Sequence, residues 1–196
     1  MERLDRAIAA IDAANAADPN TLTVDGVVRP KEQAHAELMT AWVRRLDPDA
    51  DEAQLIAARA HHLRRWSIPR DDYADGRAGY LKWRTALKKQ HADEVASILT
   101  TAGYDDDTIA RVQRIIRKDG LGRSDDDAVQ THEDALCLVF LETQLDELAS
   151  KMGNDKTVAI LQTTAKKMSP AGLEAAHALR FSPPASALLE RALAAS

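Results

Sequence analysis

The sequence is poor in the residues that cross-link, bend or anchor a chain. It has one cysteine, Cys137, together with eight glycines and seven prolines. A single cysteine excludes an internal disulfide and a zinc site built from several cysteines. No apolar run approaches the roughly twenty residues needed to span a bilayer, and no secretory signal is recognisable. The net charge of −5 gives no global basic character, which argues against a nucleic-acid polymer as partner. These absences predict a cytoplasmic protein without membrane association.

The rest of the sequence is rich in alanine, and its apolar residues recur at helical spacing. At 196 residues the chain is long enough for one domain with a substantial core. Apolar residues recur three and four positions apart between the few glycines and prolines. We therefore expect an all-α protein of about eight or nine helices, with a single helical domain over residues 1–182 and a peripheral C-terminal helix over residues 183–196. Helices are expected over 2–17, 30–46, 55–66, 78–102, 105–118, 125–152, 154–168, 170–180 and 185–195.

Two segments between these helices are predicted to be loops. Residues 21–30 carry Asp25-Gly26, which is typical of a tight hairpin turn, but the segment is too short for a sheet of its own. We expect it to be an ordered loop. Residues 67–77, which include Pro69 and Gly76, are expected to form an irregular loop.

Histidines recur on the predicted inner faces. The segment LIAARAHHLRRW, residues 55–66, places His61 and His62 at the end of an apolar stretch, and His62 shares a stripe with Leu55 and Trp66. His35 and His91 also lie on apolar stripes of their helices. Histidine is a poor core residue unless its nitrogens are hydrogen-bonded or ligated. Each histidine alone is more often a core residue bonded to a carbonyl, but their joint occurrence favours a shared site.

A carboxylate completes a candidate metal centre. Asp134 shares a helical stripe with leucines, where an unpaired carboxylate is unfavourable. Imidazoles with one carboxylate suit a divalent transition metal ion such as zinc, manganese, iron, cobalt or nickel. We therefore predict that His35, His61, His62 and Asp134 hold such an ion. Glu133 is the candidate general base, and His132 could support a ligand.

A cationic segment follows the double histidine. Residues 64–89 carry eight basic and three acidic residues, a net charge of +5 within an acidic chain. One interpretation is a solvated helix face with a flexible loop. The other is an anion pocket beside the histidines, in which Arg65, Lys82 and Arg84 bind phosphate or carboxylate. Four interleaved aromatics would either stack on a ligand or pack the loop: Trp66, Tyr73, Tyr80 and Trp83.

The order of these residues resembles the HD metal-dependent phosphohydrolase superfamily. The resemblance covers about residues 30–150 and is carried by His35, AARAHH at 57–62, His91 and QTHEDALCL at 130–138. It implies that His35 is the first histidine ligand, His61 the histidine of the His-Asp doublet, and Asp134 the final aspartate. His91 matches an accessory ligand of multi-metal members. The segments HHLRRW, GYLKWRTALKKQHA and EDALCLVFLE also resemble an uncharacterised domain-of-unknown-function family.

Two positions depart from the superfamily pattern. His62 stands in place of the doublet aspartate, and Lys118 stands where many two-metal members have a histidine. A histidine cannot bridge two ions through two oxygens, so the resemblance implies a mononuclear site or a member that has lost its metal.

The function expected from the residues and the resemblance is a metal-dependent hydrolase. Its substrate would be a small phosphorylated compound or nucleotide, attacked by a water that the metal activates. Two alternatives stay open. One is an iron-dependent oxygenase of the HD fold, and the other is a non-catalytic binding or regulatory protein that retains the pocket.

Overall fold

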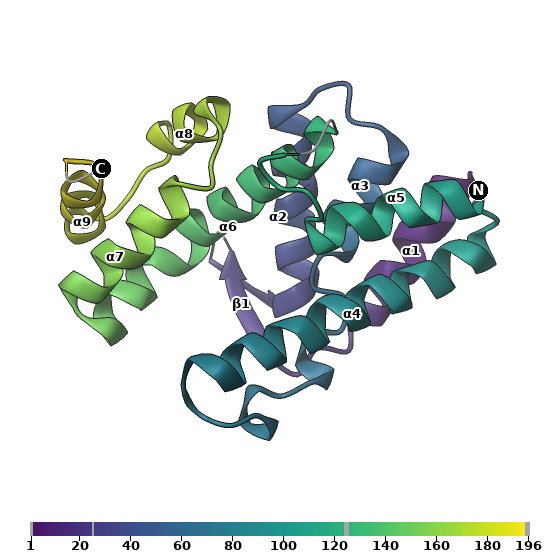
Figure 1. Cartoon of the computed structure of the whole chain (residues 1–196), viewed down its shortest axis with the longest axis horizontal. Coiled ribbons are helices and arrows are strands. Elements are labelled where there is room, and N and C mark those ends of the chain that lie inside the picture. The colour runs from purple at the N-terminus through teal and green to yellow at the C-terminus, as the bar shows by residue number, and fades with distance from the viewer. Residues whose placement is uncertain (1, 25, 124–125, 195–196) are drawn as a thin grey trace. The chain divides into compact units, whose positions relative to one another are not determined.

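The computed structural model describes residues 2–24, 26–123 and 126–194, and it confirms the all-α fold class (Figure 1). Contacts group the chain into two compact units, one ending at His132 and one beginning at Glu133. The predicted boundary after residue 182 falls inside the second unit and stays a prediction. No helix in the described part of the chain is both long and apolar enough to cross a membrane.

Helices and one hairpin build the first unit. In chain order they are α1 (Arg3–Asn15), β1 (Thr21–Val24), β2 (Val27–Pro30), α2 (Lys31–Leu46), α3 (Glu52–Ala60), the single-turn 3₁₀ helices η1 (Arg65–Ser67) and η2 (Arg70–Asp72), α4 (Gly76–Ala102), α5 (Asp106–Arg117) and the start of α6 (Asp127–Met152). The long α4 packs against both α1 and α5, and α3 packs against α2 and α5 (Figure 1).

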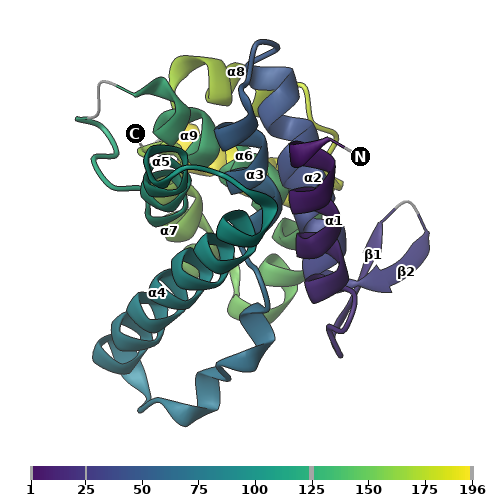
Figure 2. The same ribbon diagram turned by 90° about the vertical axis from the view of Figure 1, so that its right-hand side faces the viewer.

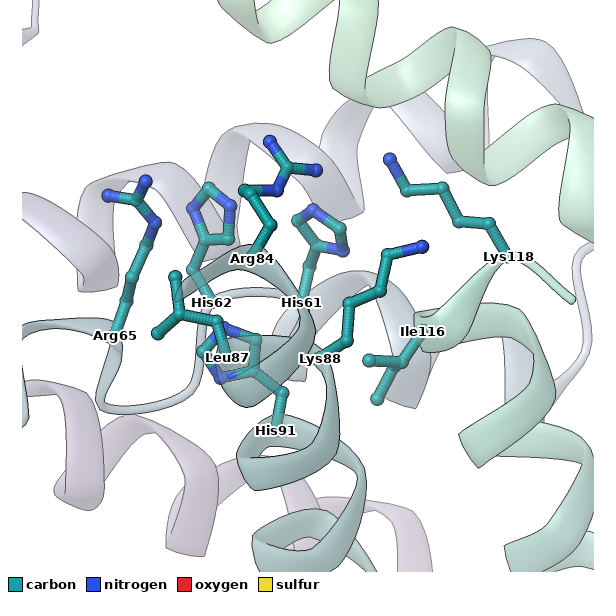
Figure 3. Close-up of a pocket in the computed structure, with 9 residues that line it drawn as sticks. All are labelled: His61, His62, Arg65, Arg84, Leu87, Lys88, His91, Ile116 and Lys118. Carbon is teal, nitrogen blue, oxygen red and sulfur yellow. The ribbon is translucent and has the colours of Figure 1, made fainter. Parts of the chain in front are cut away.

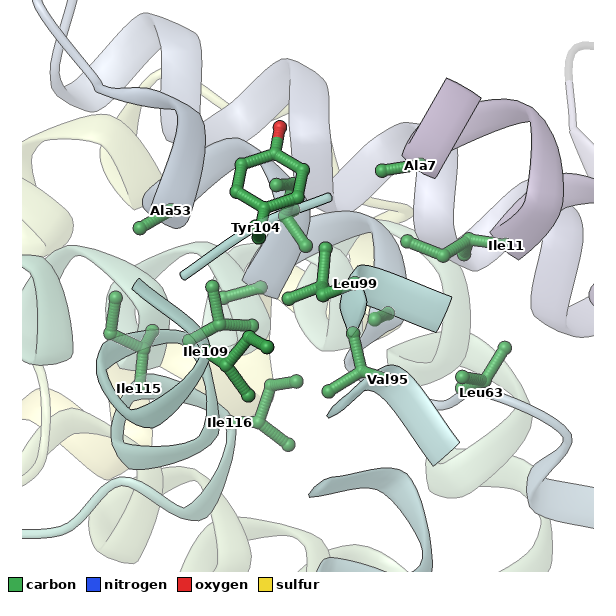
Figure 4. Packing of buried hydrophobic residues seen from close by; sticks show 14 of the residues in the cluster. Ala7, Ile11, Ala53, Leu63, Val95, Leu99, Tyr104, Ile109, Ile115 and Ile116 are labelled. Atoms are coloured by element: carbon green, nitrogen blue, oxygen red, sulfur yellow. The ribbon is translucent and has the colours of Figure 1, made fainter. Parts of the chain in front are cut away.

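Small and branched apolar side chains fill the core of this unit. Ile11 from α1, Val95 and Leu99 from α4, and Ile115 and Ile116 from α5 have almost no exposed surface (Figure 4). Alanines such as those of α3 let neighbouring helices approach closely, since a methyl group fills little space between them. Burial of each large side chain stabilises the fold by about 1.5–3 kcal/mol.

The segment expected to be an ordered loop is instead a two-stranded antiparallel hairpin (Figure 2). Thr21 pairs with Pro30 and Val24 pairs with Val27; Asp25 lies outside the described residues. Both strands contact α2, and the guanidinium of Arg29 donates two 2.6 Å hydrogen bonds to Glu37 on that helix. An isolated hairpin is marginal in water, so this support from α2 is why strands form where the sequence favoured a loop.

The second unit is built from the remainder of α6 with α7 (Asn154–Ala165), α8 (Pro170–His177) and α9 (Pro183–Ala194). Helix α9 packs on α7. Leu145, Leu161 and Leu188 are buried in this unit. Apart from the helix predicted over 55–66, whose end differs, the predicted helices agree with the observed ones to within a few residues at each end.

Candidate metal centre and cationic pocket

The double histidine follows the end of a short, well-capped helix. Asp51 caps α3 by accepting a 3.0 Å hydrogen bond from the amide of Gln54, whose side chain in turn accepts from the amide of Asp51. The sequence pattern predicted a helix through residue 66, but α3 ends at Ala60. His61 and His62 therefore lie in a turn and not on a helical stripe.

A contact from α1 explains this early end. Arg64 has a left-handed backbone conformation with φ of 49°, and its amide donates a 3.0 Å hydrogen bond to the side-chain oxygen of Asn15. Asn15 is fully buried. Asn15 lies 49 residues before Arg64 in the chain. The periodicity of residues 55–66 therefore cannot indicate this contact.

Replacement of Asn15 by alanine should loosen this turn. The variant leaves the amide of Arg64 without its acceptor, and we expect the free energy of unfolding to fall by about 1 kcal/mol. Urea denaturation followed by circular dichroism measures the change. Asn154→Ala, at an exposed position of α7, provides the control. A stability equal to that of the wild type would contradict a structural role for the Asn15 contact.

Five of the six histidines meet in the first unit. They come from α2, the turn after α3, α4 and α6. The ring centroids of His35 and His62 are 4.3 Å apart, those of His61 and His62 are 4.5 Å apart, and those of His61 and His132 are 4.7 Å apart. His91 lies 6.0 Å from His62. His35, His61, His62 and His91, which the sequence placed on apolar helix faces, thus lie in one cluster with His132. The predicted convergence of Asp134 on His35, His61 and His62 stays a prediction.

Two histidines of this cluster and one neighbouring carboxylate form a candidate metal site. Glu32, His35 and His62 each offer one ligand atom within 4.8 Å of the others. The Nδ1 atom of His62 lies 3.0 Å from Oε2 of Glu32. Ligands that stand 2.0–2.2 Å from a tetrahedral zinc-like ion are separated by about 3.3–3.6 Å. The His62–Glu32 pair needs to part by only about 0.3–0.6 Å to reach that separation, so the group could hold a metal ion.

His35 provides an independent test of this fit. The residue is only 3% exposed, and neither ring nitrogen has a hydrogen-bond partner among the described residues. A neutral imidazole has one donor and one acceptor, and leaving each unsatisfied in the interior costs about 1–3 kcal/mol. A metal ion coordinated to one nitrogen removes part of that cost, so the residues present fit such an ion.

Burial also sets the protonation states. It lowers the pKa of His35 to about 3, and it lowers the pKa of His62 well below the usual value, with His35 and His61 adding to the effect. Both imidazoles are therefore neutral near pH 7, the state that binds a metal. Burial raises the pKa of Glu32 to about 7. An adjacent cation would favour the ionised carboxylate.

Glu32 was not predicted from the sequence. It precedes His35 by three positions on α2, which places both side chains on one face of the helix. Asp18 fixes the start of this helix, because its carboxylate accepts a 2.9 Å hydrogen bond from the amide of Glu32. The spacing Glu-x-x-His was the signal in the sequence that could have identified Glu32. The predicted carboxylate ligand was Asp134 instead.

The other histidines have hydrogen bonds that orient their rings. Nδ1 of His61 lies 2.8 Å from Nε2 of His132, which assigns His132 the predicted supporting position beside a candidate ligand. Nδ1 of His91 donates to the carbonyl of Leu63 at 2.8 Å, so its Nε2 carries the lone pair. Neither His61 nor His91 belongs to the three-residue group, and their roles as ligands stay predictions.

A cationic pocket adjoins the metal site. It is lined by His61, His62, Arg65, Arg84, Leu87, Lys88, His91, Ile116 and Lys118. Figure 3 shows His61 and His62 side by side, with the four basic side chains around them. No carboxylate is among these lining residues. Such a lining suits an anionic ligand.

Two of the three predicted anion-binding residues line this pocket. Arg65 is half-buried, and its guanidinium carbon lies 4.7 Å from the centre of the Trp83 ring. Arg84 donates a 3.3 Å hydrogen bond to the hydroxyl of Tyr80. Lys82 is exposed and is not among the lining residues. Lys88 and Lys118, by contrast, line the pocket although the sequence did not single them out as anion-binding.

The two predicted acidic site residues belong to the second unit. Asp134 is buried, and its carboxylate accepts hydrogen bonds from the amide and the hydroxyl of Ser169, at 2.9 and 2.5 Å. These bonds fasten the start of α8, because the Ser169 hydroxyl caps that helix. Glu133 is buried, with Nζ of Lys167 3.8 Å from its carboxylate. The assignments of Asp134 as a ligand and Glu133 as a base stay predictions.

Comparison with known proteins gives a family but no characterised relative. Searches of curated proteins and of solved structures find no match. Residues 5–189 match one protein family, and this range includes all five clustered histidines, Glu32 and every residue that lines the cationic pocket. The chain therefore belongs to the family described as Domain of unknown function (DUF4202).

Proposed function

We propose that the protein is a metal-dependent hydrolase that acts on a small phosphorylated compound or nucleotide. One observation carries the proposal: His62 belongs both to the candidate metal group and to the lining of the cationic pocket. An ion and a bound anion would therefore be neighbours. The resemblance to the HD phosphohydrolase superfamily likewise implies a metal-dependent hydrolase, with His35, His61 and Asp134 as the ligands.

The metal ligands in this proposal are Glu32, His35 and His62, with His61 and Asp134 as the further predicted ligands. A divalent transition ion there would supply a Lewis acid and an activated water for attack on phosphorus. The ion could be zinc, manganese, iron, cobalt or nickel, since all accept nitrogen and oxygen donors. Glu32 would provide the negative charge, and the two imidazoles would bind as neutral ligands.

The basic side chains orient the substrate in this proposal. A guanidinium can donate two parallel hydrogen bonds to a phosphate group, and Arg65 and Arg84 both line the pocket. The Trp83 ring packs against Arg65, which limits the freedom of the guanidinium. Fixed donors of this kind stabilise charge that accumulates on the phosphoryl oxygens.

A direct experiment tests the proposed function. Protein purified without added metal is subjected to elemental analysis and then assayed for phosphate release from nucleoside monophosphates and small phosphomonoesters, with each of the five ions added in turn. We expect about one ion per chain and phosphate release that the Glu32→Gln variant lacks. Absence of hydrolysis with every ion would refute the proposal, and oxygen consumption after anaerobic loading with iron would favour the oxygenase.

Arg84 tests the anion-binding half of the proposal. We expect Arg84→Ala to weaken the binding of a phosphorylated compound by about tenfold or more, because it removes a charge-assisted hydrogen bond. Calorimetry measures the affinity, and circular dichroism checks that the variant is folded. Lys82→Ala is the comparison, and its effect should be smaller because that side chain is outside the lining. If Arg84→Ala and the wild type bind the phosphorylated compound with equal affinity, Arg84 belongs to a solvated helix face and does not bind the anion.

A further inference from the structure

Two aromatic rings of α4 lie beside the cationic pocket, and they differ in exposure. Trp83 is only 7% exposed, its Nε1–H donates a 2.9 Å hydrogen bond to the carbonyl of Ile68, and the guanidinium of Arg65 packs on its ring. Trp83 therefore fastens the loop before α4 to that helix. Tyr80 lies about one turn earlier, with its ring centroid 5.9 Å from that of Trp83, and 44% of the residue is exposed. Packing of the loop thus accounts for Trp83 and does not account for Tyr80.

A hydrogen bond joins Tyr80 to the pocket. Its hydroxyl accepts a 3.3 Å hydrogen bond from Nη1 of Arg84, and the guanidinium carbon of Arg84 lies 6.0 Å from the centre of the Tyr80 ring. Arg84 lines the pocket beside His61 and His62 (Figure 3). Among the described residues, Arg84 forms no ion pair with a carboxylate, and this is its one side-chain hydrogen bond. Because a guanidinium has five N–H donors, Arg84 can bind an anion without giving up its bond to Tyr80.

The spacing of these two side chains suits a ligand with a phosphate at one end and a planar ring at the other. Residues four apart on a helix are neighbours, with Cβ atoms about 5–6 Å apart. A phosphate bound by Arg84 would therefore leave the rest of the ligand within reach of the exposed Tyr80 ring. Every nucleobase has a π face that stacks on an aromatic side chain, and such stacking strengthens binding by about tenfold or more. A sugar phosphate has no such face and would leave the ring in water.

We propose that Tyr80 is a ring-stacking residue of this site and that the ligand is a nucleotide, with its phosphate at Arg84 and its base against Tyr80. The inference rests on the proposed function and deepens it, because it selects the nucleotide from the two substrate classes left open there. Two competing explanations assign no base contact to Tyr80. In one, the hydroxyl only orients Arg84. In the other, Tyr80 is an ordinary exposed side chain.

Ligands that differ only in the base separate these explanations. Calorimetry measures the binding of phosphonate analogues of adenosine monophosphate, uridine monophosphate and ribose 5-phosphate, whose carbon–phosphorus bond resists hydrolysis. The wild type should bind at least one nucleotide analogue about tenfold more tightly than the ribose analogue. In Tyr80→Ala this preference should fall to about twofold or less, because the stacking surface is removed.

Two further variants isolate the ring. Tyr80→Phe keeps the ring, removes the hydroxyl that bonds to Arg84, and should retain the preference for the nucleotide analogue. Leu81→Ala removes the neighbouring side chain, which is 52% exposed and points about 100° around the helix from Tyr80. It should bind all three compounds as the wild type does. Circular dichroism should show wild-type melting temperatures for all three variants, because both side chains are exposed.

Three results with these variants would overturn the inference. One is a loss of base preference in Leu81→Ala equal to that in Tyr80→Ala, and another is loss of the preference in Tyr80→Phe. The third is equal weakening of all three compounds in Tyr80→Ala with the preference unchanged, which would show that Tyr80 acts only through Arg84.

The outcomes distinguish this inference from the proposed function. A base preference that depends on Tyr80, in a protein that releases phosphate from no compound with any ion, would support the inference and refute the hydrolase. Release of phosphate from ribose 5-phosphate as fast as from the nucleotides, unchanged in Tyr80→Ala, would support the hydrolase and overturn the inference. A wild-type protein that binds neither nucleotide analogue more tightly than the ribose analogue would also overturn the inference.

Discussion

Glu32→Gln is expected to lose at least about nine-tenths of the bound metal while it stays folded. The substitution keeps the size of the side chain but removes the negative charge of the three-residue group and replaces it with a weakly coordinating amide. Loss of outer partners of metal ligands already costs 10–100-fold in affinity, so loss of a ligand should cost more. Elemental analysis of protein purified without added metal measures the effect.

The same variant separates metal loss from unfolding. Glu32 is only 3% exposed, and burial makes its ionised form costly. In metal-free protein, glutamine should therefore leave the melting temperature unchanged or raise it. Glu37→Gln, on the same helix but hydrogen-bonded to Arg29, should keep the wild-type metal content. Full metal content in Glu32→Gln would exclude this carboxylate as a ligand.

His62→Ala and His62→Asp should differ sharply in metal content. Alanine removes a nitrogen donor from the candidate site, so we expect most of the metal to be lost. Aspartate restores a donor, and its second oxygen is able to bridge to another ion. His62→Asp should therefore retain one ion and acquire the capacity for a second. Elemental analysis of both variants, with and without an excess of manganese, gives the stoichiometry.

Stability measurements on His62→Ala test the competing explanation, in which His62 is a structural residue and not a metal ligand. If His62 were only a packed residue bonded to Glu32, alanine would reduce the free energy of unfolding by about 1–3 kcal/mol and leave the metal content unchanged. That combination would contradict the ligand assignment. Loss of metal from a variant that unfolds cooperatively near the wild-type temperature would agree with it.

The helices were predictable because their signals are local. Apolar spacing located α2, α4 and α5 to within a few residues, and the same spacing placed His35 and His91 on inner faces. The pairing of β1 with β2 was not predictable, since it depends on support from α2. The end of α3 at Ala60 depends on Asn15, which no window around residues 55–66 contains.

The candidate group of Glu32, His35 and His62 was predictable in its two histidines, whereas Glu32 was not predicted. Ligand atoms of His35, His62 and Glu32, one from each, lie within 4.8 Å of one another. The sequence instead indicated Asp134, because a carboxylate is unfavourable on an apolar helix stripe. The carboxylate of Asp134 accepts two hydrogen bonds from Ser169, and these bonds compensate part of the cost of its burial. A buried carboxylate therefore indicates a partner, and the sequence alone does not say which one.

The histidine cluster joins distant parts of the chain, and this has a consequence for folding. His35 and His132 are 97 positions apart in the sequence, so their encounter depends on non-local contacts, which form more slowly during folding than the local contacts of a helix. The candidate metal group itself spans residues 32–62 and needs α2 and the turn after α3 to be in place. Metal uptake during refolding would thus mark the completion of tertiary structure, and the appearance of helical signal should precede it.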